Sequence, residues 1–213
     1  MTVADAVHAR RAVKHFDPDF TLPDEDVLKL YELARQTPTS FNIQNYRIVR
    51  LCDADLKAKA REAAWDQAQV TDASLTLLIC ADVKAWAKDP ARYWENAPEN
   101  VRDQMVPMIG DFYEGREQVQ RDEAMRSAGL VAQTLMLSAK AMGYDSCPMI
   151  GFDAEKMAEL VNLPEDHAVC LMLVIGRAAE PAKPKGGYIP NEEVFLTDGF
   201  RGPAGGRREG RRC

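Results

Sequence analysis

The 213-residue sequence lacks most of the short motifs that identify common catalytic and nucleotide sites. It contains no GxGxxG, GxxxxGK[ST], HExxH or GxSxG pattern, which argues against dinucleotide-binding loops, phosphate loops, zinc proteases and nucleophile-elbow hydrolases. Its three histidines are far apart and in dissimilar contexts, so we predict no metal site. His167 lies between a helix and a strand, where a satisfied polar surface role is expected.

The sequence also lacks paired cysteines and long apolar runs. Its five cysteines form no CxxC pair, and four lie in or beside apolar stretches, which predicts buried, reduced thiols in a cytoplasmic protein. The longest apolar run, "AVCLMLVI", has eight residues and cannot span a bilayer, and the N-terminus has no apolar signal core. We therefore expect neither a membrane partner nor export.

Positive charge is scarce except at the end of the chain. The net charge is −6, and the tail "RGPAGGRREGRRC" contributes +4, which leaves −10 on residues 1–200. Because nucleic-acid binding needs a basic face, no nucleic-acid partner is expected. We predict one domain over residues 1–200 and a disordered basic Gly/Arg tail over 201–213, whose role the sequence leaves open.

Helical and strand patterns alternate without a regular strand-helix-strand repeat, which predicts an α+β fold with one sheet buried among helices. Asp53 and Asp153 are expected to cap helices, as is Thr21. Residues 82–118 read as an excursion that is helical in pieces. The remaining expectations are a first helix at 2–10, strands "YRIVRLC", "SLTLLICA" and "AVCLMLVIGRA", a buried helix at 121–142, and an extended bend at "YDSCPMIGFD".

Two groups of residues on predicted loops look like ligand contacts. Arg10, Arg11 and Lys14 place three positive charges within five residues. They read either as a solvated basic surface or, together with Lys183 and Lys185, as two loops that close on one phosphate.

Neutral hydrogen-bonding side chains gather about two dozen residues later, in "PTSFNIQ". Thr39, Ser40, Asn42 and Gln44 could bond the polar edge of a heterocycle, or they could form a hydrophilic turn.

These stretches resemble the FMN-dependent nitroreductase family. The resemblance is carried by "RRAVKHF", "PTSFNIQ", "RSAGLVAQTLMLSAKAMGYDSCPMIGFD" and "AVCLMLVIGRA", in order and spacing over residues 3–198, and it is strongest for a bacterial NAD(P)H nitroreductase branch linked to quinone stress. It implies a nitroreductase-like fold, with a central, mostly antiparallel or mixed sheet surrounded by helices. It also implies a long central helix, a C-terminal arm exchanged in a homodimer, and two FMN sites at the subunit interface.

The resemblance assigns roles to individual residues. Arg10, Arg11 and Ala12 match the loop that holds the FMN phosphate and ribityl chain, and Lys185 matches a second phosphate cation. Lys183 is expected at the phosphate only from its place beside Lys185. Lys14 lies near flavin N1 and the C2 carbonyl, where it tunes the potential. The partner chain lays Pro38, Thr39, Ser40 and Asn42 against the isoalloxazine, while Pro148, Met149, Ile150 and Gly151 form the segment whose backbone N–H faces N5.

The sequence departs from the family pattern at the flavin's pyrimidine edge. The family often supplies an Asn and a Lys there, whereas this chain has "DQAQ", so Asp66, Gln67 or Gln69 must make the contact. Phe41 and Phe112 are expected to wall the substrate pocket.

The resemblance implies an NAD(P)H-dependent flavin oxidoreductase that reduces nitroaromatics, quinones or similar planar acceptors by ping-pong two-electron transfer. It needs no side-chain acid or base, because flavin N5 carries the hydride. The alternatives are a flavin-binding or flavin-consuming protein without NAD(P)H turnover, and a helical interaction protein. The physiological acceptor and the choice between NADH and NADPH stay open.

Overall fold

The computed structural model describes residues 1–200, which fall into two compact units. The first is Met1–Lys183, and the second begins at Pro184 and includes the short helix α8 (Asn191–Val194). In the second unit the Lys185 ammonium lies 4.0 Å from the centre of the Tyr188 ring. The prediction of a single domain through residue 200 stays a prediction, and the tail at 201–213 lies outside the described residues.

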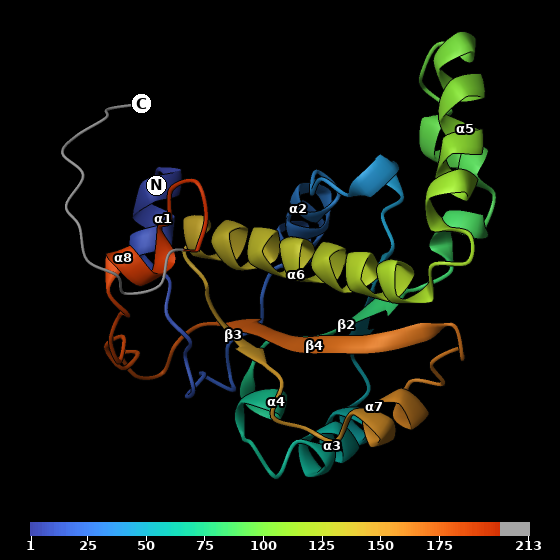
Figure 1. Cartoon of the computed structure of the whole chain (residues 1–213). Helices are drawn as coiled ribbons and strands as arrows, with labels where there is room; N and C mark the ends of the chain where they lie inside the picture. Colours follow the sequence, from blue (N-terminus) through green and yellow to red (C-terminus); the bar gives the residue numbers. More distant parts are fainter. Residues whose placement is uncertain (201–213) are drawn as a thin grey trace, which may run out of the picture. The chain divides into compact units, whose positions relative to one another are not determined.

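A four-stranded sheet forms the centre of the first unit (Figure 1). Its strands are β1 (Tyr46–Leu51), β2 (Leu75–Asp82), β3 (Asp145–Met149) and β4 (His167–Gly176). Their order is β1-β2-β4-β3 and all three pairings are antiparallel, which confirms the predicted α+β fold with one sheet among helices. A register shift between Ile79 and Cys80 marks a bulge in the β2–β4 ladder.

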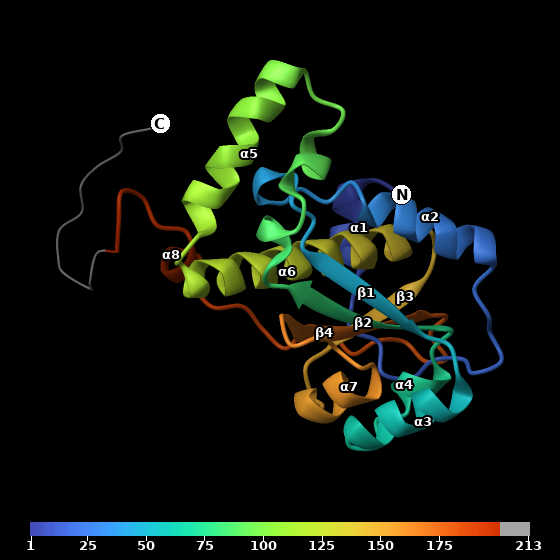
Figure 2. The ribbon, with the colours of Figure 1, turned by 90° about the vertical axis from the view of Figure 1, so that its right-hand side faces the viewer.

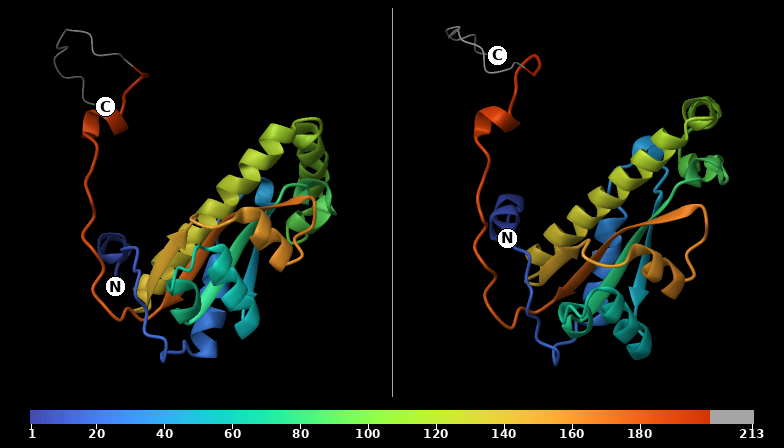
Figure 3. Two further views of the ribbon diagram at one scale, coloured as in Figure 1. Left: turned by 90° about the horizontal axis from the view of Figure 1, so that it is seen from below. Right: turned by 60° about the horizontal axis from the view of Figure 1, so that its bottom comes forward.

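Helices cover both faces of the sheet (Figure 1). One face carries α2 (Asp24–Ala34) and α6 (Glu117–Ala141), and the other carries α3 (Ala54–Ala63), α4 (Gln69–Asp72) and α7 (Ala154–Leu160). Figure 3 shows α3 and α7 over the sheet in the view from below. Every residue of β2 is buried because the strand is covered on both sides, which explains its mostly apolar sequence; the exceptions are Thr76 and Asp82.

The long helix α6 lies along the sheet and fills one core. Small and medium apolar side chains on one side of the helix are buried against β2, β4 and α2, among them Ala128, Val131, Leu135 and Ala139. These small residues let the helix approach the sheet closely. The predicted start at 121 was too late, because the helix begins at Glu117 without a side-chain cap.

The excursion between β2 and α6 is more regular than its prolines suggested. It contains the 3₁₀ turns η2 (Ala85–Ala87) and η3 (Pro90–Trp94) and the helix α5 (Glu99–Tyr113), which continues through Pro107. Figure 2 shows α5 standing away from the sheet beside the first end of α6. Ile109 and Tyr113 anchor it to a separate apolar cluster.

Four further local predictions had mixed outcomes. Asp53 and Asp153 cap α3 and α7 with their carboxylates, as predicted. The Thr21 prediction was wrong, because the residue before α2 is Pro23 and no side chain caps the helix. The bend predicted at "YDSCPMIGFD" was also wrong in its first half. Asp145–Met149 form the edge strand β3, where Pro148 is tolerated because an edge strand need not donate every N–H.

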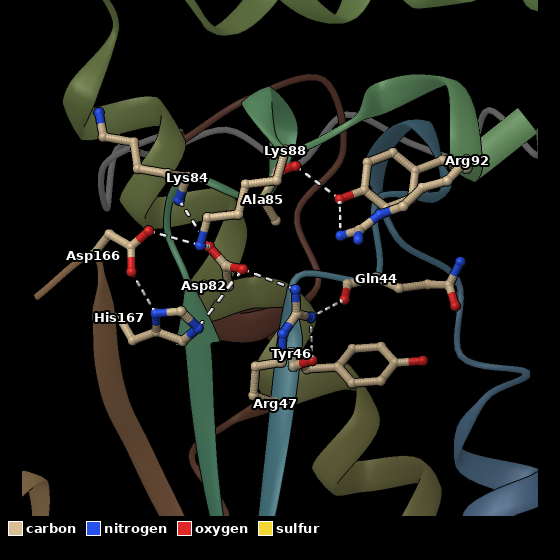
Figure 4. A network of polar contacts seen from close by, with 11 residues as sticks. Gln44, Tyr46, Arg47, Asp82, Lys84, Ala85, Lys88, Arg92, Asp166 and His167 are labelled. Carbon is tan, nitrogen blue, oxygen red and sulfur yellow. Dashed lines mark hydrogen bonds and ion pairs between the residues drawn. The ribbon is translucent and has the colours of Figure 1, made fainter. Parts of the chain in front are cut away.

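A buried carboxylate joins the sheet to the excursion. The side chain of Asp82, at the end of β2, is 2% exposed. Its oxygens lie 2.8 Å from Arg47 Nη2 and 2.9 Å from Lys88 Nζ, and they accept a 3.2 Å hydrogen bond from the Lys84 N–H. Figure 4 shows His167 approaching from β4, with Nε2 3.6 Å from Asp82. The carboxylate thus holds β1, β2, β4 and the excursion together.

Asp166 completes this cluster. It accepts from Lys88 Nζ at 2.6 Å and lies 2.6 Å from His167 Nδ1. The hydrogen bond from Lys88 lowers the pKa of Asp166 despite partial burial. Burial alone would lower the pKa of Lys88, but the hydrogen bonds to Asp166 and Asp82 outweigh it and raise that pKa. Asp82, Asp166 and His167 offer metal-ligand atoms within 4.8 Å of one another, but two cations already neutralise the carboxylates. His167 is less exposed than its predicted surface role requires.

Replacing Asp82 with Asn should destabilise the first unit, because Arg47 and Lys88 would lose their shared counter-charge at a buried position. We expect the free energy of unfolding to fall by about 2–4 kcal/mol in guanidinium denaturation. Asp103→Asn is the matched control, since that carboxylate is 68% exposed and its loss should cost no more than about 0.5 kcal/mol. Equal effects of the two substitutions would contradict a stabilising role for Asp82.

Candidate functional site

The basic loop that follows α1 (Val3–Ala9) runs along the edge of the sheet. The Val13 N–H donates to the Ser146 carbonyl at 3.1 Å, and Ala12 forms a parallel bridge with Ser146. Val13 and Phe16 are buried, whereas Ala12 and Lys14 are exposed. Main-chain pairing with β3 therefore fixes which residues of this loop face outward.

Two cations of the loop lie close to β3. Burial raises the pKa of the Cys147 thiol. Lys14, through its charge and a hydrogen bond, and Arg10, through its charge, act in the opposite direction and lower that pKa. Arg11 is directed elsewhere, because its Nη1 donates to the carbonyls of His8 at 2.7 Å and Arg10 at 2.8 Å. It thus caps the end of α1, whereas the charges of Arg10 and Lys14 act on Cys147 of β3.

The segment that continues from β3 presents backbone donors beside these cations. Pro148 and Met149 end the strand, and Ile150 is 82% exposed. Within residues 1–200, the N–H groups of Ile150 and Gly151 donate no hydrogen bond. Exposed N–H groups without an internal acceptor are available to an acceptor atom of a ligand.

One of the three pyrimidine-edge candidates touches this segment. Gln67 Nε2 donates to the Gly151 carbonyl at 2.7 Å and to the Ala64 carbonyl at 3.0 Å, and Gln67 Oε1 accepts from Gln69 Nε2 at 3.0 Å. Gln69 is buried, and Asp66 is exposed and paired with Arg61 at 2.6 Å. The structure thus brings Gln67 to the segment, supported by Gln69, and turns Asp66 away.

The polar stretch 38–42 lies away from the basic loop and from the segment that follows β3. Its 3₁₀ turn η1 (Ser40–Asn42) has left-handed backbone at Phe41 (φ 50°) and Asn42 (φ 57°). Asn42 Nδ2 donates to the Tyr93 carbonyl at 2.9 Å, and Thr39 Oγ1 accepts from the Gln44 N–H at 3.0 Å. Left-handed conformations cost energy for residues other than glycine and are often found at functional sites.

The two predicted substrate aromatics are neighbours. The rings of Phe41 and Phe112 lie 5.6 Å apart, and Tyr113 packs against both at 6.1 and 4.9 Å. Phe112 is partly exposed, so the pair offers an aromatic surface at the base of α5.

The two groups of candidate residues are separated along α6. The loop at 10–16 and the segment 146–151 lie near the last turns of α6, whereas η1 lies near its first turns, and the views agree on this (Figures 1 and 3). One chain therefore does not bring Arg10 and Lys14 together with Ser40 and Asn42. Lys183 is exposed at the end of the first unit, and Lys185 belongs to the second.

Comparison with known proteins identifies the family. The model of the Nitroreductase family matches residues 7–177. The chain belongs to the nitroreductase family. Protein DrgA from Synechocystis sp. is 56% identical over 185 residues, which cover 87% of this chain and 88% of DrgA. The protein named Putative NAD(P)H nitroreductase MhqN, from Bacillus subtilis, is 36% identical over 195 residues, covering 88% and 94% of the two chains.

Solved nitroreductases have the same fold. The nitroreductase ydfN from Bacillus subtilis superimposes with a TM-score of 0.85 at 35% identity, covering 91% of this chain and 97% of that one. A nitroreductase from Exiguobacterium sibiricum, solved in complex with FMN, gives a TM-score of 0.86 at 26% identity and covers 93% and 98%. The predicted nitroreductase-like fold is confirmed.

This nitroreductase has one prominent residue at the site that sequence reasoning missed. The Trp65 side chain is 69% exposed, with φ 54°, and it lies against Gly151. A Cβ atom at Gly151 would lie 3.1 Å from Trp65 Cζ3, so the absence of a side chain there makes room for the indole. The signal in the sequence was a lone aromatic between "REAA" and "DQAQ".

Among residues 1–200, no helix combines the length and the apolar character needed to cross a membrane.

Proposed function

We propose that this nitroreductase uses FMN and NAD(P)H to reduce small planar acceptors such as nitroaromatics and quinones. The observation that carries the proposal is the basic loop hydrogen-bonded along β3, on the strand that leads to the N–H groups of Ile150 and Gly151, which have no acceptor within residues 1–200. A loop with fixed cations next to free backbone donors suits a cofactor that has an anionic phosphate and a ring with acceptor atoms.

The residues present fit FMN. Arg10 would hold the phosphate, and Arg11 would act mainly by keeping the end of α1 in place. The phosphate contacts expected from Lys183 and Lys185 stay predictions. Lys14 would face the pyrimidine side of the ring, and Gln67 would position the segment that offers the N–H of Ile150 or Gly151. Assigning these roles to single residues is part of the proposal.

Bound FMN would supply the acceptance of hydride from NAD(P)H and the transfer of two electrons to the acceptor, which predicts ping-pong kinetics. The chain supplies position and charge. Lys14 stabilises the negative charge that reduction places on the ring, because a fixed cation interacts strongly with developing charge in a partly desolvated site. Trp65 offers an exposed ring against which a planar acceptor could stack. NAD(P)H and the acceptor would bind in turn at the same open face of the flavin, and their reactions need no side-chain acid or base.

We also propose a homodimer in which each site is built from both chains, because η1 lies at the opposite end of α6 from the basic loop. Exposed apolar side chains support a protein partner surface, among them Val3 and Val7 on α1, Leu28 on α2 and Leu130 on α6. Large apolar side chains at 188–200 suit an arm that is exchanged with the second copy. The expectations that the protein has no nucleic-acid partner and that it is cytoplasmic stay predictions.

The proposed activity predicts that the purified protein is yellow and shows flavin absorbance bands. Anaerobic addition of NADH or NADPH should bleach these bands within seconds, and a quinone such as menadione should restore them. A flavin that binds but is not reduced by either dinucleotide would contradict the enzymatic proposal and favour a flavin-binding protein. A protein that stays colourless after soaking in FMN would contradict the cofactor itself.

Lys14→Met should lower the midpoint potential of the bound flavin by roughly 30–60 mV. The substitution removes a charge-assisted hydrogen bond of about 1.5–3 kcal/mol that favours the reduced ring, and about 30 mV corresponds to 1.4 kcal/mol for two electrons. FMN should still bind, because the phosphate contacts are unchanged. Spectroelectrochemical titration measures the shift, and Lys59→Met, on the exposed side of α3, is the control. A Lys14→Met potential equal to that of the control would remove Lys14 from the flavin.

The dimer proposal predicts that deletion of residues 184–213 costs both bound flavin and solubility, since the arm would no longer cover its partner. Deletion of 201–213 alone is the matched control and should cost neither. Light scattering coupled to size-exclusion chromatography measures the mass of each variant. A full-length chain that elutes as a monomer with FMN bound would overturn the proposed shared site.

A further inference from the structure

A polar pocket of about 630 Å³ lies beside η1, on the side where the excursion meets the sheet. Its walls come from the end of α2, the loop at 42–44, the start of β1 and the turn η3 with the residues that follow it. The volume falls within the range of about 300–1,000 Å³ that is typical of small-molecule sites. The pocket belongs entirely to the first unit.

Guanidinium groups dominate the charge of this pocket. Arg35, Arg47 and Arg92 line it together with a single carboxylate, Glu95. Arg47 is paired with Asp82, but neither Arg35 nor Arg92 forms an ion pair within residues 1–200. Two guanidinium groups without a carboxylate partner are therefore concentrated at one concave site, on a chain whose first 200 residues carry a net charge of −10.

Hydrogen bonds hold the walls of the pocket in place. Asn42 links η1 to η3 through its 2.9 Å bond to the Tyr93 carbonyl. Arg92 Nη2 donates to the Tyr93 hydroxyl at 2.9 Å, and that hydroxyl donates to the Ala85 carbonyl at 2.7 Å. Gln44 has left-handed backbone (φ 49°), and its carbonyl accepts from Arg47 Nη1 at 2.8 Å. Figure 4 shows Arg47, Arg92 and Gln44 on the same side of this network.

We infer that this pocket binds the phosphate groups of the dinucleotide reductant. The inference rests on the proposed function and extends it to a second region of the site. Guanidinium groups match phosphate oxygens in bidentate geometry, whereas a neutral nitroaromatic or quinone offers them no counter-charge.

The position of the pocket supports this choice of ligand. Asn42 lines the pocket and also belongs to the stretch that we propose to border a flavin. A dinucleotide whose nicotinamide lies on that flavin would leave its phosphates next to η1. In the proposed dimer, the η1 of one chain borders the flavin held by the basic loop of the other. The pocket beside that η1 would therefore bind the dinucleotide that reduces this flavin.

The test uses the full-length, FMN-loaded protein with Arg35→Gln, Arg92→Gln and the double substitution. KM for NADPH and for NADH is measured with saturating menadione. We expect the double variant to raise KM for NADPH about tenfold or more, with the loss appearing in KM rather than in kcat, because the contact binds a part of the substrate remote from the reacting atoms. Lys29→Gln is the control, since it removes one exposed positive charge from α2 outside the pocket.

Comparison of the KM values for NADPH and NADH shows which phosphate group the pocket binds. A rise in KM for NADPH alone assigns the pocket to the 2′-phosphate, and an equal rise for NADH assigns it to the pyrophosphate. A double variant whose KM values match those of Lys29→Gln would overturn the inference while leaving the proposed activity intact.

A binding measurement that needs no electron transfer separates the inference from the proposed function. Adenosine 2′,5′-bisphosphate and ADP are titrated into the parent protein and the double variant by calorimetry. Binding by the parent that weakens about tenfold or more in the double variant supports a phosphate pocket even if neither dinucleotide is oxidised. Failure of the parent to bind either compound at millimolar concentration overturns it.

Discussion

The buried carboxylate of Asp82 is the contact on which the arrangement of this molecule depends. It terminates the most deeply buried strand, and it draws cations from β1 and from the excursion to one point. Such a group is costly to bury alone and stabilising only when its partners are in place. The sheet, the excursion and the orientation of Arg47 are therefore linked. Because Arg47 is also a wall of the proposed phosphate pocket, the same contact connects the stability of the fold with the shape of a binding surface.

The candidate flavin site depends on a different property of the sheet, namely its free edge. β3 is an edge strand, and an edge strand presents main-chain groups that need partners. The basic loop pairs with it at Ser146, so the cations of the loop are positioned by backbone hydrogen bonds rather than by their own side chains. Beyond Met149 the pairing ends, and the next N–H groups are left for a ligand. The candidate site thus lies where one strand stops pairing, and in the proposed homodimer the second chain would bring its η1 stretch to it.

Much of the fold could be predicted from local sequence, and the failures have identifiable physical causes. The caps at Asp53 and Asp153 and the buried strand β2 follow from short-range patterns in the sequence, although the same capping rule failed at Thr21. The strand at 145–149 was missed because Pro148 reads as a turn, although an edge position tolerates it. Within the candidate site, the basic loop was predicted from its clustered charges and Gln67 only as one of three alternatives, whereas Trp65 and the Asp82 cluster depend on contacts between distant segments. Neither periodicity nor spacing carries information about such contacts.

The contact between Trp65 and Gly151 limits how the site can change during evolution or design. A side chain at position 151 and the indole at position 65 compete for the same volume, so each position restricts the residues allowed at the other. A relative with a small residue at 65 could accept a side chain at 151, beside the exposed N–H groups. An alanine at 151 would need the exposed indole to shift by only a few tenths of an ångström, whereas a larger side chain would displace it further. The effects of substitutions at these two positions should therefore be non-additive.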